Sequence, residues 1–370
     1  MRRVAALAAV VFAAHAGAAS AAPSADARAW LVENASTGEV LAAHDADERL
    51  PIASITKLMT VLVVLDHHKL TDVVTVDPRV AGVGEESIRL RAGEQLTVAD
   101  LLRGALIQSA NDAADALALA TAPSFTAFAQ LMNAKAAQLG LHESRFVRPD
   151  GLDAPGEYSS AHDVTVLARD AMKNAFVRAT VAERTATIPG RTLYTWNRLL
   201  GVVPGVVGVK TGHTNEAGWC QVIARDLDGN TMYVTILGSP SEWQRDTDLK
   251  TLLAWAADQY RLVDAISTTR DYAQVALPYG RGSLPLVART PLQSLVHVGR
   301  PLTERVVASA SVSLPVAKGA VLGHVEIWSG GRLLGRRALV ASRAVSSPGV
   351  AGRVGWYARR TVHDALGLFG

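Results

Sequence analysis

The chain has 370 residues, of which 49% are hydrophobic and 19% charged, with a formal net charge of +3. This composition is typical of a globular protein long enough for one large and one small domain, and so small a net charge gives no indication of nucleic-acid binding. The one cysteine, Cys220, excludes an intramolecular disulfide framework. It lies in an apolar strand pattern, where we expect a small buried side chain.

Residues 1–22 have the three parts of a signal peptide. Arg2 and Arg3 give a positive start, residues 4–14 are apolar, and residues 19–21 are the small side chains of a cleavage site. The apolar run is short and rich in alanine, which disfavours a membrane-spanning anchor. We therefore predict that the mature chain is exported.

A β-hairpin is expected over residues 29–42, and the tetrad Ser54-Ile55-Thr56-Lys57 follows it. Residues 61–65 are all apolar, which indicates a buried helix, so we expect Ser54 near its N-terminus with Lys57 one turn away on the same face. A desolvated lysine can activate a serine, and a helix N-terminus can stabilise an oxyanion. Alone, this motif is common and its serine is more often a cap.

Two helices joined by a polar bend are expected next. Residues 97–108 have apolar side chains at helical spacing, and an alanine-rich helix is expected from about Asp112 to Ala120. Ser109 and Asn111 lie in the bend, so both side chains can point into one cleft. The alternative is that they only cap the second helix.

Further helices are expected over residues 124–139, closed by Gly140, and after Ser160, which can act as an N-cap. Residues 82–87 are rich in glycine but lack the strand–helix context of a phosphate-binding loop. We expect a loop there, on the rim of a site.

An antiparallel sheet is expected in the following part. β-Branched residues before Lys210 indicate a strand that carries Lys210, Thr211 and Gly212. Further elements are expected at residues 218–224 (strand), 228–230 (hairpin turn), 231–237 (strand) and 249–262 (amphipathic helix).

Three motifs follow one another along the chain: Ser54-x-x-Lys57, Ser109-x-Asn111 and, after a long interval, Lys210-Thr211-Gly212. Together they are far more specific than any one alone. On these motifs the chain resembles the low-molecular-mass penicillin-binding proteins, the serine-type D-alanyl-D-alanine carboxypeptidases. The resemblance implies an α/β fold. A β-lactamase/transpeptidase-like domain, with an antiparallel sheet flanked by helices, is expected over residues 23–265, followed by a small all-β sandwich.

The resemblance also implies the chemistry. Ser54 attacks the carbonyl between the two D-alanines of a peptidoglycan stem peptide, and Lys57 takes its proton. Ser109 relays a proton to the leaving amine, and Asn111 holds the substrate amide and the lysine. D-Alanine leaves, and water hydrolyses the acyl-enzyme.

The third motif is implied to bind the substrate. Lys210 and Thr211 hold the terminal carboxylate, and Gly212 lets the substrate backbone approach the strand. The N–H groups of Ser54 and His213 form the oxyanion hole. No cofactor is expected, and the sequence has no metal-ligand cluster.

Other activities use the same nucleophile. A DD-endopeptidase or a β-lactamase is an alternative, and a penicillin-binding scaffold without turnover is another. No Glu-x-x-x-Asn motif stands between Asn111 and Lys210. Without the deacylating carboxylate of that motif we expect a long-lived penicillin adduct, which favours a carboxypeptidase over a β-lactamase.

The C-terminal third differs in sequence pattern from the rest of the chain, because its apolar runs are short and broken by proline and glycine. Residues 268–273 suggest a linker, and short apolar runs over residues 274–346 suggest the β-sandwich. Residues 353–370 have an apolar stripe with aromatic and basic neighbours, which predicts an amphipathic helix on a membrane surface. The alternative is a helix docked on the β-domain.

The expected partners are therefore stem peptides, β-lactams and a membrane surface, with no nucleic acid. The expected location is the periplasm or the extracytoplasmic face of the cytoplasmic membrane.

Overall fold

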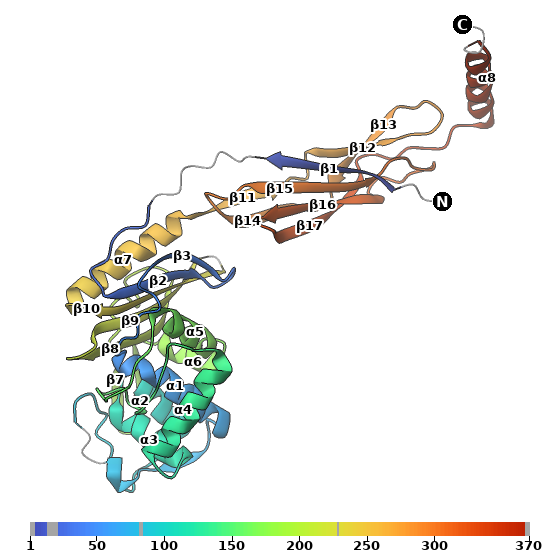
Figure 1. The fold of residues 1–370 in the computed structure, drawn as a ribbon. Coiled ribbons are helices and arrows are strands. Elements are labelled where there is room, and N and C mark those ends of the chain that lie inside the picture. The colour runs from blue at the N-terminus through green and yellow to red at the C-terminus, as the bar shows by residue number, and fades with distance from the viewer. Residues whose placement is uncertain (1–3, 13–20, 81–83, 228, 367–370) are drawn as a thin grey trace. The chain divides into compact units, whose positions relative to one another are not determined.

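The computed structural model describes residues 4–12, 21–80, 84–227 and 229–366. The chain divides into two compact units, one of residues 21–258 and one that begins at Gln259 and includes the N-terminal residues. Each unit has its own sheet (Figure 1).

A five-stranded antiparallel sheet is the centre of the first unit, as predicted. Its order is β3 (Glu39–His44), β2 (Ala29–Asn34), β10 (Asn230–Ser239), β9 (Gly218–Leu227) and β8 (Val206–Thr214). Because alternate residues of a strand face opposite sides, Val222 packs in one apolar core and Ile223 in another. Within the described residues β8 pairs with no strand other than β9, so it is an edge of the sheet.

Helices supply most of the core on one side of this sheet. They are η1 (Ala53–Thr56), α1 (Lys57–His67), α2 (Val98–Leu106), α3 (Asn111–Thr121), α4 (Phe125–Leu139), α5 (Ala161–Ala171) and α6 (Ala175–Val181). Every residue from Lys57 to Val64 is buried, which confirms the predicted core helix. Thr97 caps α2 with a capping box, Ser160 caps α5, and Gly140 ends α4 in the left-handed conformation.

Short elements complete the unit: β4 (Val73–Thr75) with β5 (Gln95–Thr97), β6 (Thr185–Ile188) with β7 (Arg191–Tyr194), and the turn η2 (Pro78–Val80). Residues 82 and 83 of the expected loop lie outside the described residues. Cys220 is fully buried in β9, as predicted, and burial raises the pKa of its thiol to about 11.

The helix predicted over residues 249–262 is wrong at both ends. Helix α7 spans Glu242–Asp258, and β11 (Tyr260–Ile266) follows it. The first turns of α7 bury Arg245 and Asp246, which are bonded to each other, so the apolar pattern did not extend to them. Ser241 marks the true start, where its Oγ accepts from the N–H of Gln244.

The second unit is built of strands, which confirms the predicted fold class. Its larger sheet has the order β1 (Val4–Phe12), β15 (Leu302–Ser309), β16 (Val321–Ser329), β17 (Arg332–Ala341), β13 (Ser283–Ala288) and β12 (Asp271–Ala276). A smaller sheet pairs β11 with β14 (Leu292–His297). The linker predicted over residues 268–273 is therefore wrong, because β12 begins within it.

The two ends of the chain carry predictions of their own. Of the predicted signal peptide, residues 1–3 and 13–20 lie outside the described residues, and in the full chain β1 pairs with β15. Helix α8 (Val350–Leu366) follows the larger sheet in the chain. The ring of Trp356 lies edge-on to the ring of Tyr279, with 5.6 Å between the ring centroids. No helix in the described part of the chain is long and apolar enough to cross a membrane.

Candidate active site

Ser54 lies in the turn η1, directly before α1. Strand β8 packs tightly against this turn. A Cβ at Gly212 would meet the backbone O of Ile52 at 2.8 Å and the backbone N of Ser54 at 3.1 Å. Glycine at position 212 therefore lets β8 approach Ser54 itself, which is a different reason from the substrate approach that the resemblance implied.

Lys57 is hydrogen-bonded to Ser54 and to two further acceptors. Its Nζ donates to Ser54 Oγ at 2.8 Å, to Asn111 Oδ1 at 2.7 Å and to the backbone O of Asp150 at 2.5 Å. The side chain is fully buried, and this desolvation lowers the pKa of Lys57 to about 8. A large fraction of the amine is then neutral near pH 8, and a neutral amine can accept the serine proton.

Ser109 and Lys210 form the second polar pair. Lys210 Nζ donates to Ser109 Oγ at 2.8 Å and to the backbone O of Thr211. Both side chains are buried, and burial holds the pKa of Lys210 well below its usual value. Ser109 has a φ of 62°, in the left-handed region that non-glycine residues rarely adopt. The bend between α2 and α3 thus holds this hydroxyl at a defined place.

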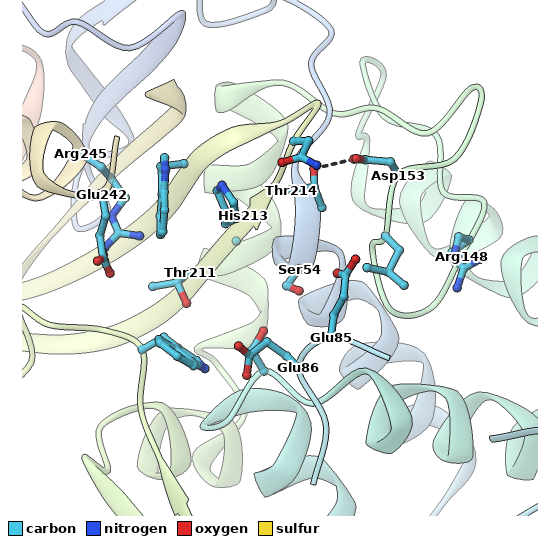
Figure 2. A pocket seen from close by; sticks show the side chains of 16 residues that line it. Ser54, Glu85, Glu86, Arg148, Asp153, Thr211, His213, Thr214, Glu242 and Arg245 are labelled. Carbon is cyan, nitrogen blue, oxygen red and sulfur yellow. Dashed lines mark hydrogen bonds and ion pairs between the residues drawn. The ribbon is translucent and has the colours of Figure 1, made fainter. Parts of the chain in front are cut away.

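These groups border a pocket of about 670 Å³. The predicted residues that line it are Ser54, Ser109, Thr211, Gly212 and His213 (Figure 2). The side chains of Lys57, Asn111 and Lys210 lie behind this lining and hold its hydroxyl groups in place. Because β8 is a sheet edge next to η1, an extended peptide could add along it and bring its carbonyl to Ser54.

Residues 148–151 form a turn that packs against η1. At Gly151, with a φ of +74°, a Cβ would lie 2.2 Å from the backbone O of Ala53, so the turn is pressed against η1. Glu157 fixes it, since its carboxyl accepts from Thr56 Oγ1 and from the backbone N–H groups of Val147 and Arg148. The turn supplies the carbonyl that Lys57 contacts.

Sequence reasoning missed all six charged residues that line the pocket, which are Glu85, Glu86, Arg148, Asp153, Glu242 and Arg245. Glu85 and Glu86 come from the loop that we expected on the rim, and Arg245 comes from α7. Arg245 is 1% exposed, donates to Asp246 Oδ1 at 2.7 Å and lies over the Trp219 ring. The signal for Arg245 was a polar stretch before an apolar helix, which is too weak to predict a buried cation.

The serine is hydrogen-bonded to a buried lysine, and it lies at the start of a helix beside an edge strand. This arrangement is typical of serine enzymes that form acyl-enzymes. The model of the family "D-alanyl-D-alanine carboxypeptidase" matches residues 16–240, and the model "Penicillin-binding protein 5, C-terminal domain" matches residues 270–347. The chain therefore belongs to the D-alanyl-D-alanine carboxypeptidase family.

Relatives match over most of the chain. D-alanyl-D-alanine carboxypeptidase DacC of Escherichia coli (strain K12) is 33% identical, covering 94% of this chain and 91% of its own. Penicillin-binding protein 5 from Haemophilus influenzae is a similar structure, with a TM-score of 0.64 at 26% identity over 89% of this chain and all of its own. The Streptomyces K15 DD-transpeptidase matches with a TM-score of 0.62 at 31% identity, over 65% of this chain and 100% of its own.

Proposed function

We propose that the chain is a serine D-alanyl-D-alanine carboxypeptidase that removes the terminal D-alanine from peptidoglycan pentapeptide stems. The observation that carries the proposal is the 2.8 Å hydrogen bond between Lys57 Nζ and Ser54 Oγ, made by a buried amine whose pKa is lowered to about 8. Family membership supports the substrate class, and penicillins acylate the same serine.

Acylation begins when the neutral amine of Lys57 takes the proton of Ser54 Oγ. The oxygen attacks the carbonyl carbon between the two D-alanines, and the backbone N–H groups of Ser54 and His213 stabilise the oxyanion. The proton then passes from Lys57 through Ser109 Oγ to the leaving nitrogen, the C–N bond breaks and D-alanine departs. Asn111 holds both the lysine and the substrate amide.

Deacylation uses the same groups with water as the nucleophile. Water gives a proton to Lys57 and attacks the ester carbonyl. The C–O bond to Ser54 breaks, and Ser54 Oγ takes the proton back from Lys57. The enzyme is then ready for a new stem peptide.

Recognition of the terminal carboxylate is assigned to the cationic side of the pocket. Thr211 supplies a hydroxyl, and Lys210 and Arg245 supply positive potential. Arg245 joins this set because it lines the same pocket as Thr211.

The decisive experiment measures D-alanine release from a pentapeptide ending in D-Ala-D-Ala, with the chain lacking residues 1–22 and its Ser54→Ala variant. Release by the first and none by the second is expected. Covalent penicillin labelling of Ser54 without D-alanine release would point to a DD-endopeptidase or a scaffold. Rapid release of penicilloate would point to a β-lactamase. Absence of labelling would overturn the proposal.

Export through residues 1–22 and membrane contact through α8 complete the proposal. Val350, Val354 and Tyr357 of α8 are exposed, which suits a membrane surface, while the contact of Trp356 with Tyr279 favours docking on the β-domain. Co-sedimentation with anionic lipid vesicles, with and without residues 350–370, separates the two. Binding that needs these residues supports the membrane contact, and equal recovery of both chains excludes it.

A further inference from the structure

One buried carboxyl close to Lys57 has no part in the mechanism above. Asp115 lies one turn after Asn111 in α3, so both side chains share a face of the helix. That face points to α1, because Asn111 Oδ1 accepts from Lys57 Nζ at 2.7 Å. Asp115 is 3% exposed, and its Oδ1 has no hydrogen-bond partner among the described residues. A buried carboxylate oxygen without a donor disfavours the charged form, so the neutral form of Asp115 is favoured.

The neighbouring aspartate of the same helix differs in this respect. Asp112 is also buried, but its two oxygens accept from Ser87 Oγ and from the backbone N–H groups of Ile88 and Leu90. Asp112 therefore anchors the loop before α2. Asp115 Oδ1 accepts no such hydrogen bond from a neighbouring segment, so the burial of Asp115 needs another explanation.

The charges that act on Asp115 come from three elements. Asp150 and Arg148 face it from the turn, Lys57 from α1, and Asp112 from α3. Arg148 already donates to both oxygens of Asp150, at 2.9 and 2.6 Å. Burial first, and Asp150 second, raise the pKa of Asp115 to about 7.

Among the described residues, four further elements that pack on α3 bring no buried charge to it. The buried residues of α2, α4, β4 and η2, which also pack on α3, are apolar or glycine. Lys57 itself is additionally faced by Glu157 and Glu86. Asp115 and Lys57 therefore change charge in neighbouring pH ranges, about 7 and about 8, within one buried cluster.

We propose that Asp115 is a positioning residue whose own charge controls how firmly Lys57 holds its proton. The inference rests on the proposed role of Lys57 as the base that activates Ser54. When Asp115 is ionised, its negative charge stabilises the ammonium form of Lys57, which cannot accept the serine proton. When Asp115 is neutral, Lys57 loses its proton at a lower pH and Ser54 is activated sooner.

The test is the pH dependence of acylation by benzylpenicillin, followed by stopped-flow from about pH 5.5 to 9.5, a span that brackets both titrations. It compares the chain lacking residues 1–22 with its Asp115→Asn variant. The acid limb of the variant should move to lower pH by about 0.5 to 1 unit, so that acylation on that limb is roughly three- to tenfold faster. Asp66→Asn is the matched control, because it removes an exposed carboxyl of α1 that is bonded to Lys135. Its profile should coincide with that of the wild type.

The outcomes separate the inference from the proposed function. If the wild type is not acylated at Ser54, the proposed function fails. If it is acylated and a folded Asp115→Asn shows an unchanged limb, or one moved to higher pH, the inference is overturned. Asp115→Ser repeats the test if the asparagine variant does not fold, and Asp115→Glu should retain the wild-type limb. Independently of any variant, carbon-13 NMR of aspartate-labelled wild type should show a carboxyl that titrates near pH 7, and its absence overturns the inference.

Discussion

Two buried carboxylates of the second unit and one buried amine of the first unit have opposite kinds of partner. In the second unit Glu304 and Glu326 are 4% and 3% exposed, and each accepts from an arginine, Arg270 and Arg336 respectively. In the first unit Lys57 is fully buried, and its three acceptors are neutral oxygens.

This difference decides what each buried group can do. Arg336 holds the pKa of Glu326 below its usual value, so that carboxylate keeps its charge near neutral pH. Burial without a directly bonded opposite charge moves the pKa of Lys57 toward neutrality. The two paired carboxylates of the second unit keep their charge, whereas Lys57 of the first unit, bonded to neutral oxygens, is able to exchange a proton.

The largest expected effect comes from removing the buried amine. Lys57→Met keeps much of the side-chain volume but has no base, so acylation by a fluorescent penicillin should fall by about 10²- to 10⁴-fold. Arg336→Met is the counterpart in the second unit and should leave acylation unchanged. Equal losses in both variants would show that the comparison between the units is wrong.

A smaller loss is expected when the contact between β8 and η1 is opened. Gly212→Ala places a Cβ against the backbone of Ile52 and Ser54 and should slow acylation by about 100-fold, because a displacement of about 1 Å misaligns the nucleophile. Gly355→Ala in α8 is the control, since a Cβ there meets no atom within 4 Å. An unchanged acylation rate for Gly212→Ala would contradict the tight approach.

Arg245→Gln should act on recognition more than on chemistry. Losing this cation should raise KM for a peptide with a free terminal carboxylate about tenfold, with a lesser effect on kcat. Arg198→Gln is the matched control for this variant, because Arg198 contacts the same Glu242 and Asp246 from an exposed position. Steady-state D-alanine release measures both constants. A fall confined to kcat would remove Arg245 from carboxylate binding.

The smallest expected effect is on the free energy of unfolding, whose dependence on pH should be opposite for Glu157 and Glu326. Burial raises the pKa of Glu157 to about 7. The contribution of Glu157 to the free energy of unfolding is therefore present below about pH 4.5 and is lost as the pH rises through about 7. The lowered pKa of Glu326 gives a contribution present above about pH 4.5 and lost as the pH falls.

Urea unfolding at several pH values tests this pair. Glu157→Gln should flatten the decline in the free energy of unfolding between about pH 5 and 7, by about 1 kcal/mol. Glu326→Gln should instead flatten the loss at acid pH. Slopes that change in the same direction in both variants would count against the contrast between the units.

Much of the first unit could be predicted from local patterns. The all-round apolar run after Lys57 required a buried helix, Ser160 marked a helix start, and β-branched residues before Lys210 required a strand. The pattern failed at the start of α7, where Arg245 and Asp246 are buried by pairing with each other. Apolar periodicity carries no signal for such a pair.

The sequence by itself predicted which residues bear the chemistry, and it determined that Ser54 and Lys57 share one face, because helical spacing is a local property. Only the tertiary structure decided what surrounds them. Asp150 lies 93 positions from Lys57 in the chain and Ser109 lies 101 from Lys210, yet each pair is in hydrogen-bond contact. The burial that lowers the pKa of Lys57 and raises that of Asp115 arises only when these distant segments pack together, because desolvation depends on every neighbour at once.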